Sequence, residues 1–320
     1  MAEITFVHPM YLWFLLTIPL FIVTHFYLLK HSKKKAFKFA NFETIKRVTG
    51  DKIITKNMTV LFSRIVILIL VIFAVSGAVL WYEGESNKND FIIAIDTSAS
   101  MSAEDLEPTR LDAAKEHAKQ FIDLLRTDAR VGIVTFSGVT FINQVPTNSK
   151  LEQKSSLNDI DIVQAGGTDI PGAIITAANL LADSKKGRTL ILITDGSSTI
   201  GAFLDNSIDE GIAYALDQHL IVHTIGTGGV GEQPIGYIPE YYNISAVYNE
   251  KNLKRISSAT GGNYYHAFDN QALIDAFRDI SSDSDKAILQ VDLSLGLMLM
   301  VMIMLFFEWG LINIRFKNIP

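Results

Sequence analysis

The chain has 320 residues, no cysteine and a formal net charge of −6. The absence of cysteine excludes disulfide bonds and any catalytic mechanism that uses a thiolate. The mean hydropathy of +0.25 is high for a soluble protein, and three apolar runs account for it.

These runs predict transmembrane helices over residues 10–29, 65–82 and 291–311. The first two have the length that a helix needs to cross a bilayer, about 20 residues. The third is short between Asp292 and Glu308, so we expect one of these charges at the headgroup level or a span that extends beyond Glu308. No Lys or Arg precedes the first run, which argues for a retained span rather than a cleaved signal peptide.

The distribution of basic residues predicts the topology. Segment 30–64 is rich in Lys and Arg and contains only Glu43 and Asp51 as acidic residues. The positive-inside rule therefore places this segment in the cytoplasm, together with the tail 312–320. The short N-terminal segment 1–9 and the large region between the second and third spans are then expected outside.

The basic segment also contains Phe37, Phe39 and Phe42. This composition suits a loop that lies on anionic membrane lipid. It equally suits a docking surface for a cytoplasmic partner. Because the cytoplasmic segment is basic while the whole chain is acidic, the external region is acidic, which argues against nucleic acid as its partner.

The external region alternates strand patterns with helix patterns. From residue 91 to 282 this alternation predicts a doubly wound, mainly parallel α/β sheet with one hairpin. Short polar linkers, 83–90 and 283–290, would join this domain to the second and third spans. The predicted strands are 91–95, 131–136, 139–145, 188–194, 220–225 and 263–267.

Oxygen-bearing side chains follow two of these strands and one glycine-rich loop. In open α/β sheets, ligands bind just beyond the carboxyl ends of the strands. Carboxylate and hydroxyl oxygens are ligands that Mg²⁺ prefers, although ligand type alone leaves Mn²⁺ and Ca²⁺ open. The side chains at these positions are those of Asp96, Ser98, Ser100, Thr168 and Asp195.

This arrangement resembles the metal-ion-dependent adhesion site (MIDAS) of von Willebrand factor A (VWA) domains, and it matches at all five positions. The resemblance implies a VWA fold, which is Rossmann-like. It also implies that Ser98, Ser100 and Thr168 bind the metal directly. Asp96 and Asp195 would bind it directly or through water.

The flanking segments are similar to those of the bacterial aerotolerance-associated Bat proteins. They are DTSASMSAEDLEPTRLDAAKEHAKQFI at 96–122, HTIGTGGVGEQPIGYIP at 223–239 and NLKRISSATGGNYYHAFDNQALIDAF at 252–277. The resemblance implies a multi-pass protein of the bacterial cytoplasmic membrane, with its VWA domain on the external or periplasmic side. It also implies a complex with other VWA-containing Bat proteins and a MoxR-type AAA+ ATPase, in stress tolerance or complex assembly.

We therefore expect a metal-dependent protein-binding module rather than an enzyme. An acidic side chain of a partner would complete the coordination of the metal. One alternative is a structural VWA scaffold whose metal does not exchange. A magnesium-dependent phosphoryl-transfer enzyme is disfavoured, because it would want a second carboxylate where Ser98 stands and a lysine near the metal, which no site segment carries.

Overall fold

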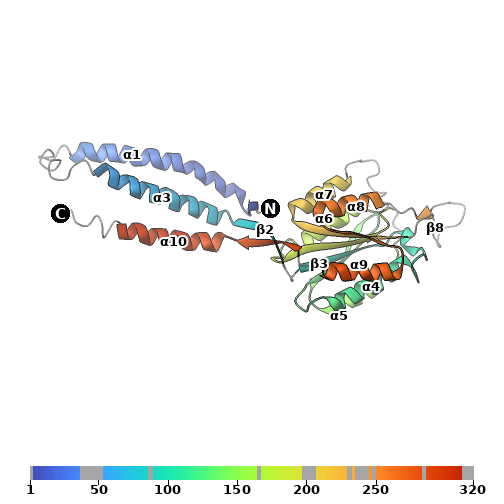
Figure 1. Cartoon of the computed structure of the whole chain (residues 1–320). Coiled ribbons are helices and arrows are strands. Elements are labelled where there is room, and N and C mark those ends of the chain that lie inside the picture. The colour runs from blue at the N-terminus through green and yellow to red at the C-terminus, as the bar shows by residue number, and fades with distance from the viewer. Residues whose placement is uncertain are drawn as a thin grey trace. The chain divides into compact units, whose positions relative to one another are not determined.

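The computed structural model describes residues 3–36, 53–85, 89–163, 167–196, 207–228, 233–234, 245–246, 250–282 and 286–311. The chain divides into two compact units (Figure 1). One contains residues Met1–Tyr82 and Gln290–Pro320, and the other contains Glu83–Leu289. Residues 37–52 of the predicted basic segment 30–64 and the tail 312–320 lie outside the described residues.

The second unit is built on a six-stranded sheet with the order β10-β7-β6-β3-β4-β5. The strands are β3 (Asn89–Asp96), β4 (Val131–Phe136), β5 (Thr140–Thr147), β6 (Gly187–Thr194), β7 (Leu220–Thr227) and β10 (Tyr264–Ala267). Only the β4–β5 pair of this sheet is antiparallel. This confirms the predicted mainly parallel sheet with one hairpin. A small separate ladder pairs β8 (Gln233–Pro234) with β9 (Ser245–Ala246).

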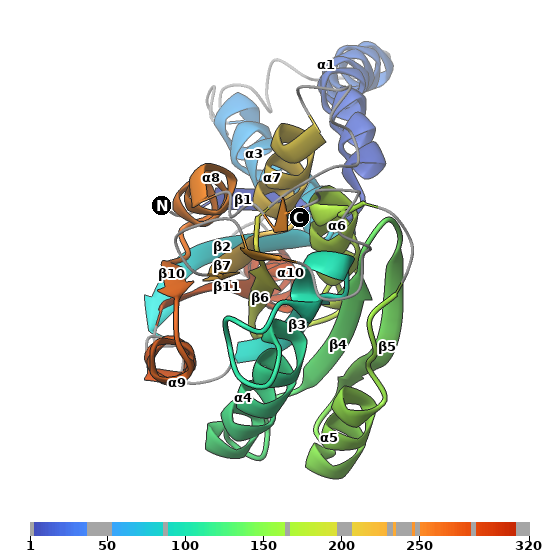
Figure 2. The ribbon, with the colours of Figure 1, turned by 90° about the vertical axis from the view of Figure 1, so that its right-hand side faces the viewer.

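Helices cover both faces of the sheet (Figures 1 and 2). On one face lie α4 (Arg110–Leu124), α5 (Lys150–Asn158) and α9 (Asn270–Ser282). On the other lie α6 (Ile170–Leu180), α7 (Ser207–Asp217) and α8 (Glu250–Thr260). Every residue of the central strand β3 is buried, as expected for a strand covered on both faces.

Aromatic rings hold the α4 and α9 face against the sheet. The ring of Phe121 on α4 lies 5.4 Å from that of Phe91 on β3 and 5.3 Å from that of Phe277 on α9, between ring centres. All three side chains are almost fully buried. Such burial stabilises the fold by roughly 2–3 kcal/mol for each side chain, so the sheet gives the site at its carboxyl edge a rigid base.

Among its described residues, the first unit contains three long helices and most of a small sheet, which ends in residues assigned to the second unit. The helices are α1 (Thr17–Ala36), which follows the 3-10 helix η1 (Pro9–Leu16), then α3 (Ile53–Val75) and α10 (Ser294–Gly310). The sheet has the order β1-β2-β11, from β1 (Glu3–Phe6), β2 (Ala78–Glu85) and β11 (Lys286–Asp292). Segments Pro9–Tyr27 and Met58–Val75 are long and apolar enough to cross a membrane, and α10 is a shorter apolar helix.

Four predicted boundaries of this unit differ from the structure. The second span, predicted over 65–82, ends at Val75, and residues 78–82 belong to β2. Much of the predicted linkers 83–90 and 283–290 is strand, and the predicted third span, 291–311, begins only at Ser294. Hydropathy cannot distinguish an apolar strand from the end of an apolar helix. The pairing of β2 with β1, which provides partners for its backbone groups, determines the outcome.

Candidate metal centre

Asp96 is the last residue of β3, and its side chain is fully buried. One carboxylate oxygen, Oδ1, accepts a hydrogen bond of 2.8 Å from the backbone N–H of Ser98. The other, Oδ2, accepts one of 2.6 Å from the hydroxyl of Thr194 at the end of β6. Asp96 therefore fixes the start of the DxSxS loop relative to the neighbouring strand.

Ser98 and Ser100 lie in a tight turn directly after β3. Ser98 has an extended backbone and precedes the 3-10 helix η3 (Ala99–Ser102). This turn brings the two serine Oγ atoms within 3.1 Å of each other. Ser98 is buried and Ser100 is half-buried, so the pair presents neutral oxygens at the boundary between the interior and solvent.

Thr168 is buried in the loop that precedes α6. Gly167 has a φ of +103°, a conformation that glycine adopts without strain. The backbone N–H of Asp169 donates a hydrogen bond of 2.7 Å to the carbonyl of Ser137, which directly follows β4. Since β4 pairs with β3 in parallel, this bond ties the Thr168 loop to the edge of the sheet where β3 ends.

Asp195 directly follows β6 and is fully buried. Strand β6 pairs in parallel with β3, with Ile193 opposite Ile95, so Asp96 and Asp195 lie at adjacent strand ends. Burial and then the negative charge of Asp195 raise the pKa of Asp96 to about 7, against the opposing hydrogen bonds from Ser98 and Thr194. Two carboxylates buried together are unfavourable unless a cation neutralises them.

The donor set fits a hard divalent cation, because the side chains offer only carboxylate and hydroxyl oxygens. The observation that supports the fit is the electrostatic repulsion between two buried carboxylates beside a pair of serine hydroxyls. Within the described ranges, no group of three or more His, Cys, Asp or Glu residues is arranged to hold a metal. The structure locates all five predicted residues at the carboxyl edge of the sheet. Their role as metal ligands stays a prediction.

The motif did not reveal Arg110, the first residue of α4. Its guanidinium is fully buried and makes two hydrogen bonds of 2.7 Å to the carboxylate of Asp105. Its Nη1 atom lies 3.7 Å from Oδ2 of Asp195. The sequence shows no lysine next to the site segments, and the structure places an arginine there instead. The spacing of residues along the chain does not indicate that this arginine, at the start of a helix, is buried.

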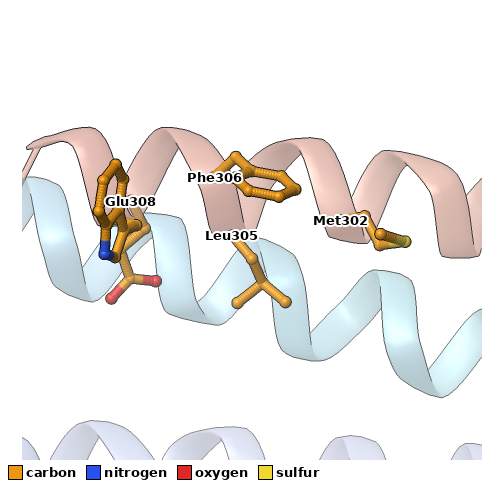
Figure 3. A pocket seen from close by; sticks show the side chains of 5 residues that line it. Met302, Leu305, Phe306 and Glu308 are labelled. Carbon is orange, nitrogen blue, oxygen red and sulfur yellow. The ribbon is translucent and has the colours of Figure 1, made fainter.

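A second cluster with buried charge lies in the first unit. A cavity of about 580 Å³ on α10 is lined by Met302, Leu305, Phe306, Glu308 and Trp309 (Figure 3). Glu308 contributes the charged group of this lining, and the other four side chains are apolar or aromatic.

Beside this cavity, Glu308 Oε1 lies 2.7 Å from Nε of Arg64 on α3. The sequence placed Arg64 at the end of the cytoplasmic segment 30–64. In the structure, α3 begins before residue 65 and Arg64 lies inside the apolar segment Met58–Val75. The cytoplasmic side of segment 30–64 stays a prediction.

Two families match separate parts of the chain. Residues 91–197 match the von Willebrand factor type A domain. Residues 1–77 match the family described as aerotolerance regulator N-terminal. The first match contains the five candidate ligands and strands β4, β5, β6 and most of β3, but ends before β7 and β10. The second contains most of the first unit.

Curated relatives extend over most of the chain but carry no functional name. A UPF0353 protein of Mycobacterium ulcerans is 27% identical over 276 residues, which are 82% of this chain and 80% of that protein. A UPF0353 protein of Mycobacterium marinum is 25% identical over 305 residues, 91% of this chain and 89% of that protein.

Two solved structures are similar to the chain. A conserved hypothetical protein BatB from Bacteroides thetaiotaomicron is 28% identical, with a TM-score of 0.52, and covers 60% of this chain and 97% of its own. An aerotolerance-related membrane protein from Bacteroides fragilis has 24% identity and a TM-score of 0.54, covering 61% of this chain and 98% of its own. The second supports the fold alone.

Proposed function

The chain is a Bat-family membrane protein with a VWA domain, and we propose that it is a membrane-anchored, metal-dependent protein-binding module of an envelope complex. One observation carries the proposal. Two buried carboxylates, Asp96 and Asp195, interact at adjacent strand ends, and Asp96 is hydrogen-bonded to Ser98. The hydroxyls of Ser98 and Ser100 come within 3.1 Å of each other. This arrangement calls for a cation and leaves neutral oxygens to hold it.

Each residue of the proposed site has a separate task. Asp96 orients the DxSxS loop through the N–H of Ser98 and anchors it to Thr194. Ser98, Ser100 and Thr168 contribute neutral oxygens, so the protein only partly offsets the charge of a divalent ion. When bound, such an ion would supply a Lewis-acidic position that an acidic side chain of a partner protein completes.

The partners we propose follow from the family. They are other VWA-containing Bat proteins and a MoxR-type AAA+ ATPase, in stress tolerance or in complex assembly. The apolar segments and the distribution of basic residues support a multi-pass protein of the cytoplasmic membrane with the VWA domain on the external or periplasmic side. The basic segment would contact lipid, a cytoplasmic partner, or both.

We expect no enzymatic activity. From the sequence, the absence of a lysine near the site argued against a phosphoryl-transfer enzyme. Arg110 places a cation beside Asp195 and weakens that argument. The remaining argument is that Ser98 occupies the place where a phosphoryl-transfer site would need its second carboxylate. Turnover of a generic phosphate ester by the purified full-length protein in Mg²⁺ would contradict this expectation.

The central experiment is a crosslinking pull-down from native membranes, in Mg²⁺ and in EDTA. It compares the wild type with Ser98→Ala, and uses Ser102→Ala as the matched control. Ser102 lies in the same turn, but its hydroxyl donates to the carbonyl of Ala99 rather than pairing with a site oxygen. We expect specific partners only in Mg²⁺, from the wild type and the control.

Identical capture in every lane would contradict metal-dependent binding. It would favour the structural scaffold, and the search for contacts would move to the basic segment and the membrane helices. Direct titration of each variant with Mg²⁺ separates a site that binds no metal from a site whose metal does not control the partner.

A further inference from the structure

Arg110 connects three segments of the chain beside the candidate metal centre. We propose that it is a positioning residue, an internal counter-cation that holds the DxSxS loop and Asp195 together when no metal is bound. This inference rests on the proposed function only in treating Asp195 as part of a metal site. Its test in EDTA does not depend on that assignment.

The first connection is to the loop between β3 and α4. Arg110 Nε and Nη2 donate to the two oxygens of Asp105, each at 2.7 Å. The backbone N–H of Arg110 also donates to the carbonyl of Ala103, at 2.9 Å. A bidentate bond between guanidinium and carboxylate fixes both distance and orientation. The segment that carries Ser98 and Ser100 is thereby attached to the start of α4.

The second connection is to Asp195. Nη1 of Arg110 lies 3.7 Å from Oδ2 of Asp195, within reach of a charge interaction but beyond hydrogen-bond distance. Nη1 is buried and makes no hydrogen bond to any of the residues that the structure describes. Burial of a guanidinium N–H without an acceptor is unfavourable, so the attraction to a neighbouring carboxylate accounts for its position.

The third connection is to the end of β7. Gly228 has a φ of +143°, and a Cβ atom there would lie 2.8 Å from Nη2 of Arg110. Any larger residue would push the guanidinium away. Thr227 also contacts the DxSxS loop, because its hydroxyl lies 3.5 Å from the sulfur of Met101. The end of β7 is therefore shaped around Arg110.

The charges explain why such a residue is useful. Asp96 and Asp195 are fully buried, and the Asp105 side chain is only 8% exposed. A site that releases its metal keeps these carboxylates, and burial without a counter-charge would favour local opening. Arg110 supplies a permanent positive charge, since a guanidinium does not lose its proton in proteins.

A purely structural reading is that Arg110 only tethers Asp105 to α4. The two readings differ in one quantity, the energetic coupling between Arg110 and Asp195. A tether predicts that Arg110→Gln and Asp195→Asn have additive effects on stability. A counter-cation predicts that Asp195→Asn is less harmful, or even favourable, once Arg110 has lost its charge.

The experiment uses the full-length protein in detergent micelles. Urea unfolding of the VWA domain is followed by pulse proteolysis in EDTA, for the wild type, Arg110→Gln, Asp195→Asn and the double variant. We expect coupling of about tenfold in the unfolding equilibrium constant. Additive effects in EDTA would overturn the proposal. The cycle between Asp105→Asn and Arg110→Gln is the positive control, because both readings expect strong coupling there.

Arg110→Lys keeps the inference testable if Arg110→Gln does not fold. Lysine retains the positive charge but lacks the planar N–H donors that bind both oxygens of a carboxylate. The coupling to Asp195 should therefore persist, while the coupling to Asp105 falls. A repeat in Mg²⁺ tests the proposed function separately. If Mg²⁺ does not stabilise the wild type while the coupling in EDTA persists, the metal site is wrong and the role of Arg110 stands.

Discussion

The two compact units each contain an arginine that contacts a buried carboxylate, but the charges balance differently. In the helical unit, Arg64 and Glu308 form a single pair between α3 and α10, with 47% and 10% of their side chains exposed. In the VWA domain, Arg110 is shared between Asp105 and Asp195, and Asp96 lies nearby without an arginine of its own. A balanced pair suits fixed packing, whereas an excess of buried negative charge suits a site that receives a cation.

This contrast shows where to look for function in a protein with several buried charges. Buried ion pairs contribute little net stability against apolar replacements, although loss of one partner is strongly unfavourable. The pair on α3 and α10 therefore indicates a specific helix contact. The carboxylates at the edge of the sheet indicate an exchangeable ligand, because the protein keeps them together in spite of their repulsion.

The largest expected effect is the pH dependence of the metal-free VWA domain. The pKa of Asp96 rises from 3.8 to about 7 on folding. Between these values the folded state holds a proton that the unfolded state has lost, so stability falls as the pH rises from about 4 to 7. At about 1.4 kcal/mol per pKa unit, the loss amounts to roughly 4 kcal/mol and stops above pH 7.

Urea unfolding in EDTA at several pH values measures this loss. Asp96→Asn should remove it, and Asp195→Asn should move the window to lower pH, because the charge of Asp195 is one cause of the raised pKa. Equal pH dependence in the wild type and Asp96→Asn would show that the carboxylates are not buried together, and the contrast between the units would fail.

The second effect concerns the pair in the helical unit. Glu308→Gln leaves Arg64 without its carboxylate and should lower the unfolding free energy by about 2 kcal/mol. This value is smaller than that for a fully buried ion pair, because the Arg64 side chain is half-exposed. The double variant Arg64→Met with Glu308→Leu should regain most of this loss. Tryptophan fluorescence during unfolding in detergent reports on this unit, because Trp13, Trp81 and Trp309 all belong to it.

Met302→Leu on the exposed surface of α10 is the matched control and should change stability by less than about 0.5 kcal/mol. If the apolar double variant is as unstable as Glu308→Gln, the pair has a role beyond helix packing. The balanced charges of the helical unit would then have to be interpreted as functional as well.

The third effect is on metal affinity. Ser98→Ala removes one neutral oxygen of the proposed site and should weaken Mg²⁺ binding about tenfold, equivalent to about 1.4 kcal/mol. Calorimetric titration of the full-length protein measures this. Ser102→Ala, in the same turn, should bind as the wild type does. Equal affinity of all three proteins would place the cation elsewhere.

The smallest effect is expected for an ion pair on the surface. Lys154 lies 2.7 Å from Asp123, and both side chains are more than a third exposed. Lys154→Ala should change the unfolding free energy by no more than about 0.5 kcal/mol. The same urea unfolding measures this change. A larger value would mean that the distance between the charges, and not their burial, determines how much an ion pair stabilises this protein.

Local patterns in the sequence predicted most of the VWA domain. The apolar run before Asp96, the alternation of strands and helices and the turn at Ser137–Gly138 all correspond to observed elements. Side-chain periodicity and turn chemistry act over a few residues, so one sequence is sufficient to read them. The five candidate ligands were predicted from the resemblance of the strand ends and the glycine-rich loop to the metal-ion-dependent adhesion site, and their role as ligands stays a prediction.

Contacts between distant residues were decided only by the tertiary structure. Nothing local predicts that Arg64 pairs with Glu308, or that Arg110 lies beside Asp195. The strand at residues 78–85 was mistaken for membrane helix and linker, because its pairing with the N-terminal strand is also a contact between distant residues. Burial of a charge and the partner of a strand depend on which segments fold together, and spacing along the chain does not contain that information.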